Sequence, residues 1–229
     1  MRTLLVQAPV QTGEAVVEGD EAHHARAVLR LKVGDEVRVA DGAGRAGLAV
    51  VSGIGREALC LEVTAVEELA PDRAGLITVA VAAPKGDRLA DLVRGLTELG
   101  VGTIQLLQTE RGERQPGNAE RLRRIAAEAL KQCRRSHLPE ILPSCSITAL
   151  AASGAVLRVL DRTGAPPRTG APAPVTLVVG PEGGLTVAEL AELAAAGAVA
   201  MRLAGPILRI ETAALAAAAV WAAAWESAP

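Results

Sequence analysis

Aromatic residues are almost absent from this sequence, which contains no phenylalanine, no tyrosine and two tryptophans among 229 residues. Proteins that read single-stranded RNA usually stack the bases on aromatic rings. This chain has no such platform to offer. If it binds RNA, it must do so with arginine, backbone amides and aliphatic walls.

Cysteine is also scarce, and its spacing is uninformative. Cys60, Cys133 and Cys145 are odd in number, lie far apart and form no Cys-x-x-Cys pair. They therefore predict neither a disulfide framework nor a zinc site. The three histidines do not have metal-ligand spacing either, so no metal is expected.

The sequence has neither a large net charge nor a long apolar run. The formal net charge is -2, so the chain is no polycation with an obvious nucleic-acid partner. The apolar stretch Thr212–Trp225 would form a helix of about 21 Å, shorter than the hydrocarbon core of a bilayer. The first residues contain no sustained apolar segment and are not expected to be a signal peptide. We therefore expect a cytoplasmic protein without a membrane anchor.

Residues 1–70 and 75–229 follow different patterns. The first range combines short strands and glycine turns with a helix that Asp20 could cap, which predicts a small β-barrel. The second alternates strands with helices, which predicts a mostly parallel sheet. Its expected helices cover residues 88–99, 118–135, 186–196 and 211–225. Its expected strands cover 76–83, 103–107, 155–160, 175–179 and 199–203, and residues 161–174 are expected to form a loop.

The segment Val175–Leu185 places a Gly-Pro-Glu-Gly-Gly loop between a buried strand and a helix. Its glycines, Gly180, Gly183 and Gly184, let a ligand approach the backbone closely. The spacing matches neither a P-loop nor a dinucleotide-binding fingerprint. Taken alone, the segment is about as consistent with a tight turn as with a ligand site.

The segment Leu203–Ala213 forms a second strand-to-helix connection. Its backbone could receive a flat, polar ligand such as an adenine ring. The alternative is a simple chain turn in which Arg209 and Glu211 pair on the surface.

Six motifs, in matching order along the chain, resemble the RsmE-type 16S ribosomal RNA uridine-N3 methyltransferases of the knotted SPOUT class. They are Gly-Pro-Glu-Gly-Gly at 180–184, Ile-Leu-Arg-x-Glu-Thr-Ala at 207–213, Glu-Leu-Gly at 98–100, Lys-x-Asp-Arg at 85–88, Glu-Ala-x-x-Gln-x-x-Arg at 128–135, and His23/His24 with Val-Leu-Arg at 28–30. One departure is Leu-Ala-Gly-Pro at 203–206, where the family has Leu-Gly-Pro-Arg.

The resemblance implies an α/β fold with two domains. Residues 1–70 would form a PUA-like RNA-binding β-barrel, and residues 75–229 a SPOUT domain whose mostly parallel sheet contains a trefoil knot. The knot loops of this class hold S-adenosylmethionine. By position, the expected cofactor-binding residues are Leu157, Gly180, Gly183, Gly184, Leu203, Ala204, Gly205, Ile207, Leu208 and Thr212.

The implied reaction is methyl transfer from S-adenosylmethionine to N3 of a uridine in 16S ribosomal RNA. Because N3 carries a proton, catalysis needs a proton acceptor or a cation that stabilises the uridine anion. Arg209 is the candidate cation, since its planar fork can meet a uracil carbonyl. Glu182 or Glu211 could accept the proton or orient an arginine. Glu211 would also favour a helix start without any chemistry.

Basic charge gathers between Arg111 and Arg135, where eight Lys/Arg face three Asp/Glu, a local balance of +5. On the expected helix, Arg121, Arg124, Lys131 and Arg135 can point outward, either as a solvated face or as phosphate contacts. Residues 1–70 are net acidic, with seven Lys/Arg and eleven Asp/Glu. The expected RNA-binding residues are Arg26, Arg30, Lys32, Lys85, Arg88, Arg124, Lys131, Gln132 and Arg135.

The resemblance further implies a homodimer whose partners are 16S ribosomal RNA or the small subunit. Trp221 and Trp225 on the Ala-rich final helix fit such an interface, and an internal core helix is the competing interpretation. Three other functions stay open. They are a non-catalytic RNA-binding or ribosome-assembly factor, favoured by the departure at 204–206, a nucleotide- or phosphate-binding enzyme, and a methyltransferase of the same class acting on another RNA.

Overall fold

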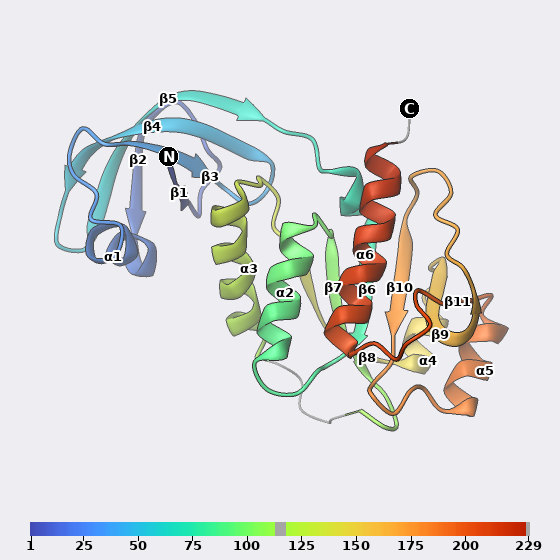
Figure 1. The fold of residues 1–229 in the computed structure, drawn as a ribbon. Coiled ribbons are helices and arrows are strands. Elements are labelled where there is room, and N and C mark those ends of the chain that lie inside the picture. Colours follow the sequence, from blue (N-terminus) through green and yellow to red (C-terminus); the bar gives the residue numbers. More distant parts are fainter. Residues whose placement is uncertain (113–117, 228–229) are drawn as a thin grey trace. The chain divides into compact units, whose positions relative to one another are not determined.

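A computed structural model describes residues 1–112 and 118–227, which form two compact units (Figure 1). The first unit comprises Met1–Pro71 and Ala127–Leu138, and the second comprises Asp72–Ala126 and Pro139–Pro229. The segment Ala127–Leu138 thus packs with the N-terminal strands, whereas the sequence patterns placed it in the second domain.

The first unit contains a sheet in the order β1-β3-β4-β5-β2, in which only the pair β1–β3 is parallel. Helix α1 (Gly19–Ala27) follows β2 directly, and its N-cap Glu18 makes no side-chain hydrogen bond, so the predicted cap by Asp20 is wrong. Alternate residues of β5, such as Leu59 and Leu61, point into one core. The strands are β1 (Arg2–Leu5), β2 (Gly13–Glu18), β3 (Glu36–Ala40), β4 (Arg45–Ile54) and β5 (Ala58–Glu68).

The end of helix α3 (Ala119–Cys133) and the residues after it complete the first unit. Leu130 packs in a cluster with Ala40 and Ala46. The Gly44 amide donates to the Ser136 carbonyl at 3.0 Å. Gly44 has φ +111, and a Cβ there would lie 2.6 Å from the His137 ring, so this approach requires glycine.

The second unit contains a sheet in the order β11-β9-β10-β6-β7-β8, and every neighbouring pair is parallel. The fold class is therefore mixed α/β with a parallel sheet. All five residues of β10 are buried, as expected for a strand covered on both faces. The strands are β6 (Ile77–Ala82), β7 (Thr103–Gln108), β8 (Glu140–Ser146), β9 (Leu157–Ala165), β10 (Val175–Val179) and β11 (Val199–Met201).

Helices cover both faces of this sheet (Figure 1). Helix α6 (Ile210–Glu226) packs on α2 (Arg88–Glu98), on β6 and on β10. Helices α4 (Ile147–Ala151) and α5 (Val187–Ala195) share an apolar cluster with β7, β9 and β10. A short 3-10 helix, η1 (Arg73–Leu76), precedes β6.

The two tryptophans of α6 lie inside the protein. Trp221 and Trp225 are each 1% exposed, and the Trp225 ring nitrogen Nε1 donates to the Gly170 carbonyl at 3.2 Å. The interpretation of these residues as interface anchors is therefore wrong, and the competing one, a core helix, is confirmed.

Most predicted elements are confirmed, including the cap of α3, where Asn118 Oδ1 accepts the backbone amides of Glu120 and Arg121. Strands β1, β2 and β8 were not predicted, because they lie at sheet edges, where burial is one-sided and the apolar pattern is weak. Strand β8 also contains Pro143, which an edge strand tolerates. Strand β9 continues to Ala165, into the range predicted as a loop.

No helix among the described residues is long and apolar enough to cross a membrane. Within residues 1–112 and 118–227, no cluster of three His, Cys, Asp or Glu side chains could hold a metal ion.

Candidate active site

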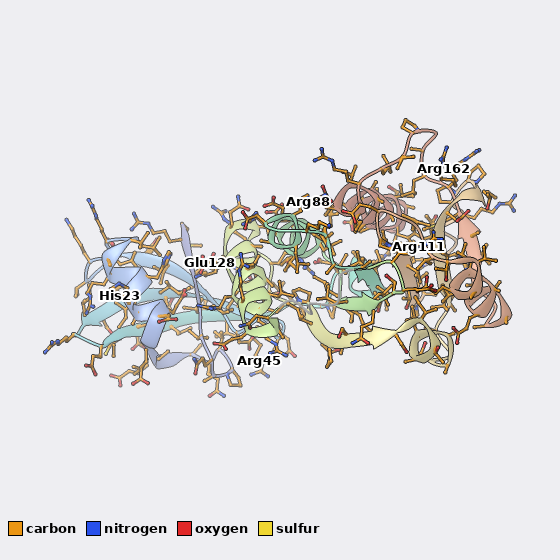
Figure 2. The ribbon with its side chains drawn as sticks, turned by 90° about the horizontal axis from the view of Figure 1, so that it is seen from below. His23, Arg45, Arg88, Arg111, Glu128 and Arg162 are labelled. Carbon is orange, nitrogen blue, oxygen red and sulfur yellow. The ribbon has the colours of Figure 1, made fainter. Side chains whose placement is uncertain are left out.

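The order of the second sheet reverses at β6. From β6 the chain proceeds through β7 to β8 on one side, whereas β10, β9 and β11 lie on the other. In open α/β sheets, ligands bind outside the carboxyl ends of the strands at such a switch point. Figure 2 is viewed from the side at which β6 and β10 end, and Arg88 and Arg111 are labelled there.

The loop after β10 is held by neighbours on both sides. Gly184 has φ +70, and its amide donates to the Pro181 carbonyl at 2.8 Å, which closes a turn. Gly180 packs against Leu185, which a Cβ at position 180 would meet at 2.9 Å. The Gly183 carbonyl accepts a hydrogen bond of 2.8 Å from Arg111 Nη1. These contacts fix the backbone of the Gly-Pro-Glu-Gly-Gly loop.

A capping box fixes the helix that follows. Thr186 Oγ1 accepts the Glu189 amide, and Glu189 Oε2 accepts the Thr186 amide at 2.7 Å. The other carboxylate oxygen of Glu189, Oε1, accepts the Glu110 amide at 2.8 Å. The loop after β7 is therefore attached to the loop after β10 through Glu189 and Arg111. Neither residue was predicted as part of the site, and only the Thr-x-x-Glu spacing of the capping box indicated Glu189.

The connection from β11 to α6 leaves its backbone unused. Among the described residues, no backbone–backbone hydrogen bond involves residues 203–208. Ile207 is 74% exposed, Leu203 and Leu208 are half-buried, and a Cβ at Gly205 would meet nothing within 4 Å. Free amides and carbonyls beside aliphatic walls fit an adenine-containing cofactor.

Two buried side-chain oxygens that lack a hydrogen-bond partner lie at the same edge. Among the described residues, three buried side-chain oxygens have no hydrogen-bond partner: Thr3 Oγ1, Thr109 Oγ1 and Glu211 Oε2. Thr109 directly follows β7 and Glu211 lies in the first turn of α6, so two of the three lie at the carboxyl edge of the second sheet. A buried polar atom without a partner commonly marks a position for water or a ligand. The residues present therefore fit a bound S-adenosylmethionine.

Arg88 joins the two candidate glutamates. Its Nη1 lies 3.5 Å from Glu182 Oε1 and 3.7 Å from Glu211 Oε2. The side chain of Glu211 is 15% exposed, and that of Glu182 is 45% exposed. Arg209, the candidate cation, is the N-cap of α6, is exposed and has no ion pair among the described residues. The structure thus brings Glu182 and Glu211 together and leaves the Arg209 guanidinium open to a ligand.

One expected cofactor residue lies elsewhere. Leu157 is the first residue of β9, pairs with Thr176 near the start of β10 and is 2% exposed. It therefore lies in the core toward the amino ends of the strands, away from the two loops, and β9 runs further than predicted. The other selected residues occupy the two loops or the start of α6: Gly180, Gly183, Gly184, Leu203, Ala204, Gly205, Ile207, Leu208 and Thr212.

The expected RNA-binding residues of the first unit differ in how far their side chains are exposed to solvent. Arg30, Lys32 and Gln132 are exposed. Arg26 is exposed but donates from Nη1 to the carbonyls of Gly55 and Arg56. Arg135 is half-buried.

Lys131 does not point outward as predicted. Its side chain is 8% exposed, and Nζ lies 2.7 Å from both Glu21 Oε2 and Glu128 Oε1. The Lys131 charge, which was predicted to contact RNA, is therefore balanced by carboxylates of the first unit. In the second unit, Lys85 and Arg124 are exposed and Arg88 is half-buried.

Sequence families match both parts of the chain. A family described as an RNA methyltransferase domain matches residues 72–222, and one described as an RNA methyltransferase PUA domain matches residues 17–64. These matches define the class of the chain, an RNA methyltransferase with an N-terminal PUA domain.

Individual relatives show which family of RNA methyltransferases this chain resembles. The ribosomal RNA small subunit methyltransferase E of Mycobacterium bovis is 35% identical over 87% of this chain and 82% of its own length. Its counterpart in Synechocystis is 33% identical over 91% of this chain and 73% of its own length. A crystal structure of the Neisseria gonorrhoeae enzyme of that name, bound to S-adenosyl methionine, superposes with a TM-score of 0.88 at 26% identity over 98% of each chain. The chain belongs to the ribosomal RNA small subunit methyltransferase E family, which confirms the resemblance seen in its motifs.

Proposed function

We propose that this protein transfers a methyl group from S-adenosylmethionine to N3 of a uridine in the 16S ribosomal RNA of the small subunit. The observation that carries the proposal is the pair of loops at the switch point, one with its backbone fixed and the other with its backbone groups unused. The cofactor bound to the gonococcal relative supports it.

The residues at the carboxyl edge supply what the reaction requires. S-adenosylmethionine, when bound against the two loops, supplies the methyl group as a sulfonium. Glu211, whose Oε2 lacks a hydrogen-bond partner, is the proposed acceptor of the N3 proton, and Glu182 is the alternative. Arg209 is the proposed cation that stabilises negative charge on the uracil carbonyls.

We further propose the architecture typical of the class, a closed barrel in the first unit and a trefoil knot in the second. A barrel is supported by the shared core of Leu4 in β1 and Val17 in β2, the two outer strands of the sheet order. The knot is proposed on the family match over residues 72–222, because knotting is typical of this class of methyltransferase.

We also propose that the protein binds RNA and forms a homodimer. The proposed phosphate contacts are the exposed Arg26, Arg30, Lys32, Lys85 and Arg124, together with Gln132 and Arg135. The proposed dimer contact is the outer side of α6, where Val220, Ala223 and Ala224 are exposed. Sedimentation of the purified protein measures the assembly state.

A non-catalytic RNA-binding factor is the second candidate, favoured by the Leu-Ala-Gly-Pro sequence at 203–206. An assay of methyl transfer distinguishes this candidate from the methyltransferase. We expect incubation of small subunits that lack the modification with labelled S-adenosylmethionine to yield 3-methyluridine on nucleoside analysis. Arg209→Gln should lower the rate about 100-fold, the usual size of a lost charge-stabilising donor. Label on a ribose hydroxyl, or no label, would contradict the proposal.

A further inference from the structure

Arg88 occupies a position that local electrostatics disfavours. It is the first residue of α2, where the unpaired amides of a helix create partial positive charge. A cation here is unfavourable unless anions surround it. A residue that breaks a local preference at the rim of a site is a candidate for a functional role.

Two carboxylates from separate segments compensate that charge. Glu182 lies in the loop after β10 and Glu211 in the first turn of α6, directly after the 203–209 connection. Both place an oxygen within 4 Å of Arg88 Nη1. Arg88 Nε also donates to the Lys85 carbonyl at 3.3 Å, which fixes the guanidinium to the end of the loop after β6. One guanidinium therefore connects the three loops that border the proposed cofactor site.

The local charge argues against a phosphate at this position. Both carboxylates already engage the guanidinium, so an RNA phosphate approaching Arg88 would have to compete with Glu182 and Glu211. About a third of the Arg88 side chain is exposed, which is enough for water but leaves the group engaged with the protein.

We propose that Arg88 is a positioning residue that holds the two cofactor loops together, and that it is not a phosphate contact. The inference rests on the proposed function, since it concerns the same site. It has two consequences. Cofactor affinity depends on Arg88 in the absence of RNA, and the electrostatic part of RNA binding does not.

The first consequence is tested by calorimetric titration of S-adenosylmethionine without RNA. Arg88→Gln is expected to raise the dissociation constant about tenfold, because Glu182 and Glu211 then repel each other across the loops. Arg88→Lys should raise it about threefold, since an ammonium keeps the charge without the planar fork. Arg94→Gln is the matched control. It lies on the same helix in an exposed pair with Asp91 and should leave the affinity unchanged.

The second consequence is tested by the salt dependence of binding to 16S ribosomal RNA. Removing a phosphate contact lowers the slope of log affinity against log salt by about 0.7–0.9. Arg124→Gln is expected to show that loss, whereas Arg88→Gln should keep the wild-type slope.

Unchanged cofactor affinity in Arg88→Gln, or a reduced salt slope, would overturn the inference while leaving the methyltransferase proposal intact. If the wild type itself bound no cofactor, that result would contradict the proposed function and, with it, the inference about Arg88. Thermal unfolding shows whether each variant is folded. If Arg88→Gln does not fold, the same calorimetric titration is made with Arg88→Lys and Glu182→Gln. Unchanged cofactor affinity in both of these variants would overturn the inference.

Discussion

The ammonium of Lys131 lies between two carboxylates of the first unit, Glu21 and Glu128. Burial lowers the pKa of Lys131, but the hydrogen bonds and charges of Glu128 and Glu21 outweigh burial, so its pKa is raised. Glu21 also accepts the Leu5 amide through Oε1, which ties α1 to β1. The cluster therefore contributes to the stability of the first unit.

Replacing Lys131 by methionine should destabilise the protein by about 1–3 kcal/mol at neutral pH, because Glu21 loses its cation while largely covered. A raised pKa means that the stabilisation is complete below the ordinary lysine pKa of about 10.4 and is lost as the pH rises through the folded-state pKa. The difference between wild type and variant should therefore shrink in strong alkali.

Urea unfolding at neutral and alkaline pH measures both effects for Lys131→Met. Lys32→Met is the control, since Lys32 is exposed. A difference that stays constant as the pH rises would show that the ammonium charge does not carry the stabilisation.

Residue type alone did not show which lysines and arginines form ion pairs within the protein. Lys131 and Arg88 follow the same basic pattern as Arg124, yet both face carboxylates from distant parts of the chain. Glu21 is 110 residues from Lys131. Side-chain pairing over such separations is fixed by the fold and leaves no local pattern, so the sequence could not predict it.

At the scale of elements, helix α5 begins where its sequence predicts. Thr186 and Glu189 form the capping box that the Thr-x-x-Glu spacing indicates. The additional bond from the Glu110 amide to Glu189 joins residues 79 apart in the chain. The capping box can be predicted from its local sequence pattern. The bond that attaches the loop after β7 to Glu189 cannot, because its partners are far apart in the chain.

Glu189→Ala should cost about 1–2 kcal/mol of stability, because it removes the capping box and leaves the Glu110 amide without its acceptor. It should also weaken cofactor binding, since the loop after β7 is then freed from the Gly-Pro-Glu-Gly-Gly loop. Urea unfolding and calorimetry measure the two effects. Glu192→Ala, in the same helix, is the control. Equal unfolding curves for the two variants would rule out this role of Glu189.

Strands buried on both faces were predictable and edge strands were not. Residues of β6 and β10 form continuous apolar runs that predict a covered parallel sheet. Strand β8 has the sequence Glu-Ile-Leu-Pro-Ser-Cys-Ser, whose proline and small polar residues conceal its pairing with β7. The polar and small residues at the end of β9 likewise concealed that this strand continues to Ala165.

For the whole molecule, sequence motifs indicate where the candidate site lies, whereas composition does not. The net charge of -2 gives no sign of an RNA partner, and the basic range 111–135 is divided between the two units. The two loops at the carboxyl edge carry the motifs Gly-Pro-Glu-Gly-Gly and Ile-Leu-Arg-x-Glu-Thr-Ala, and both belong to the second unit. We therefore expect the cofactor to bind at that edge.

Calorimetric titration of S-adenosylmethionine into the wild type and into Gly205→Trp shows whether the cofactor binds at that edge. A side chain at position 205 projects into open space, so the indole should fill the site without disturbing the fold. We expect the wild type to bind with a dissociation constant between about 1 μM and 1 mM, and the folded variant to show no binding. Equal binding by both proteins would place the cofactor elsewhere, and no binding by the folded wild type at millimolar cofactor would contradict the account.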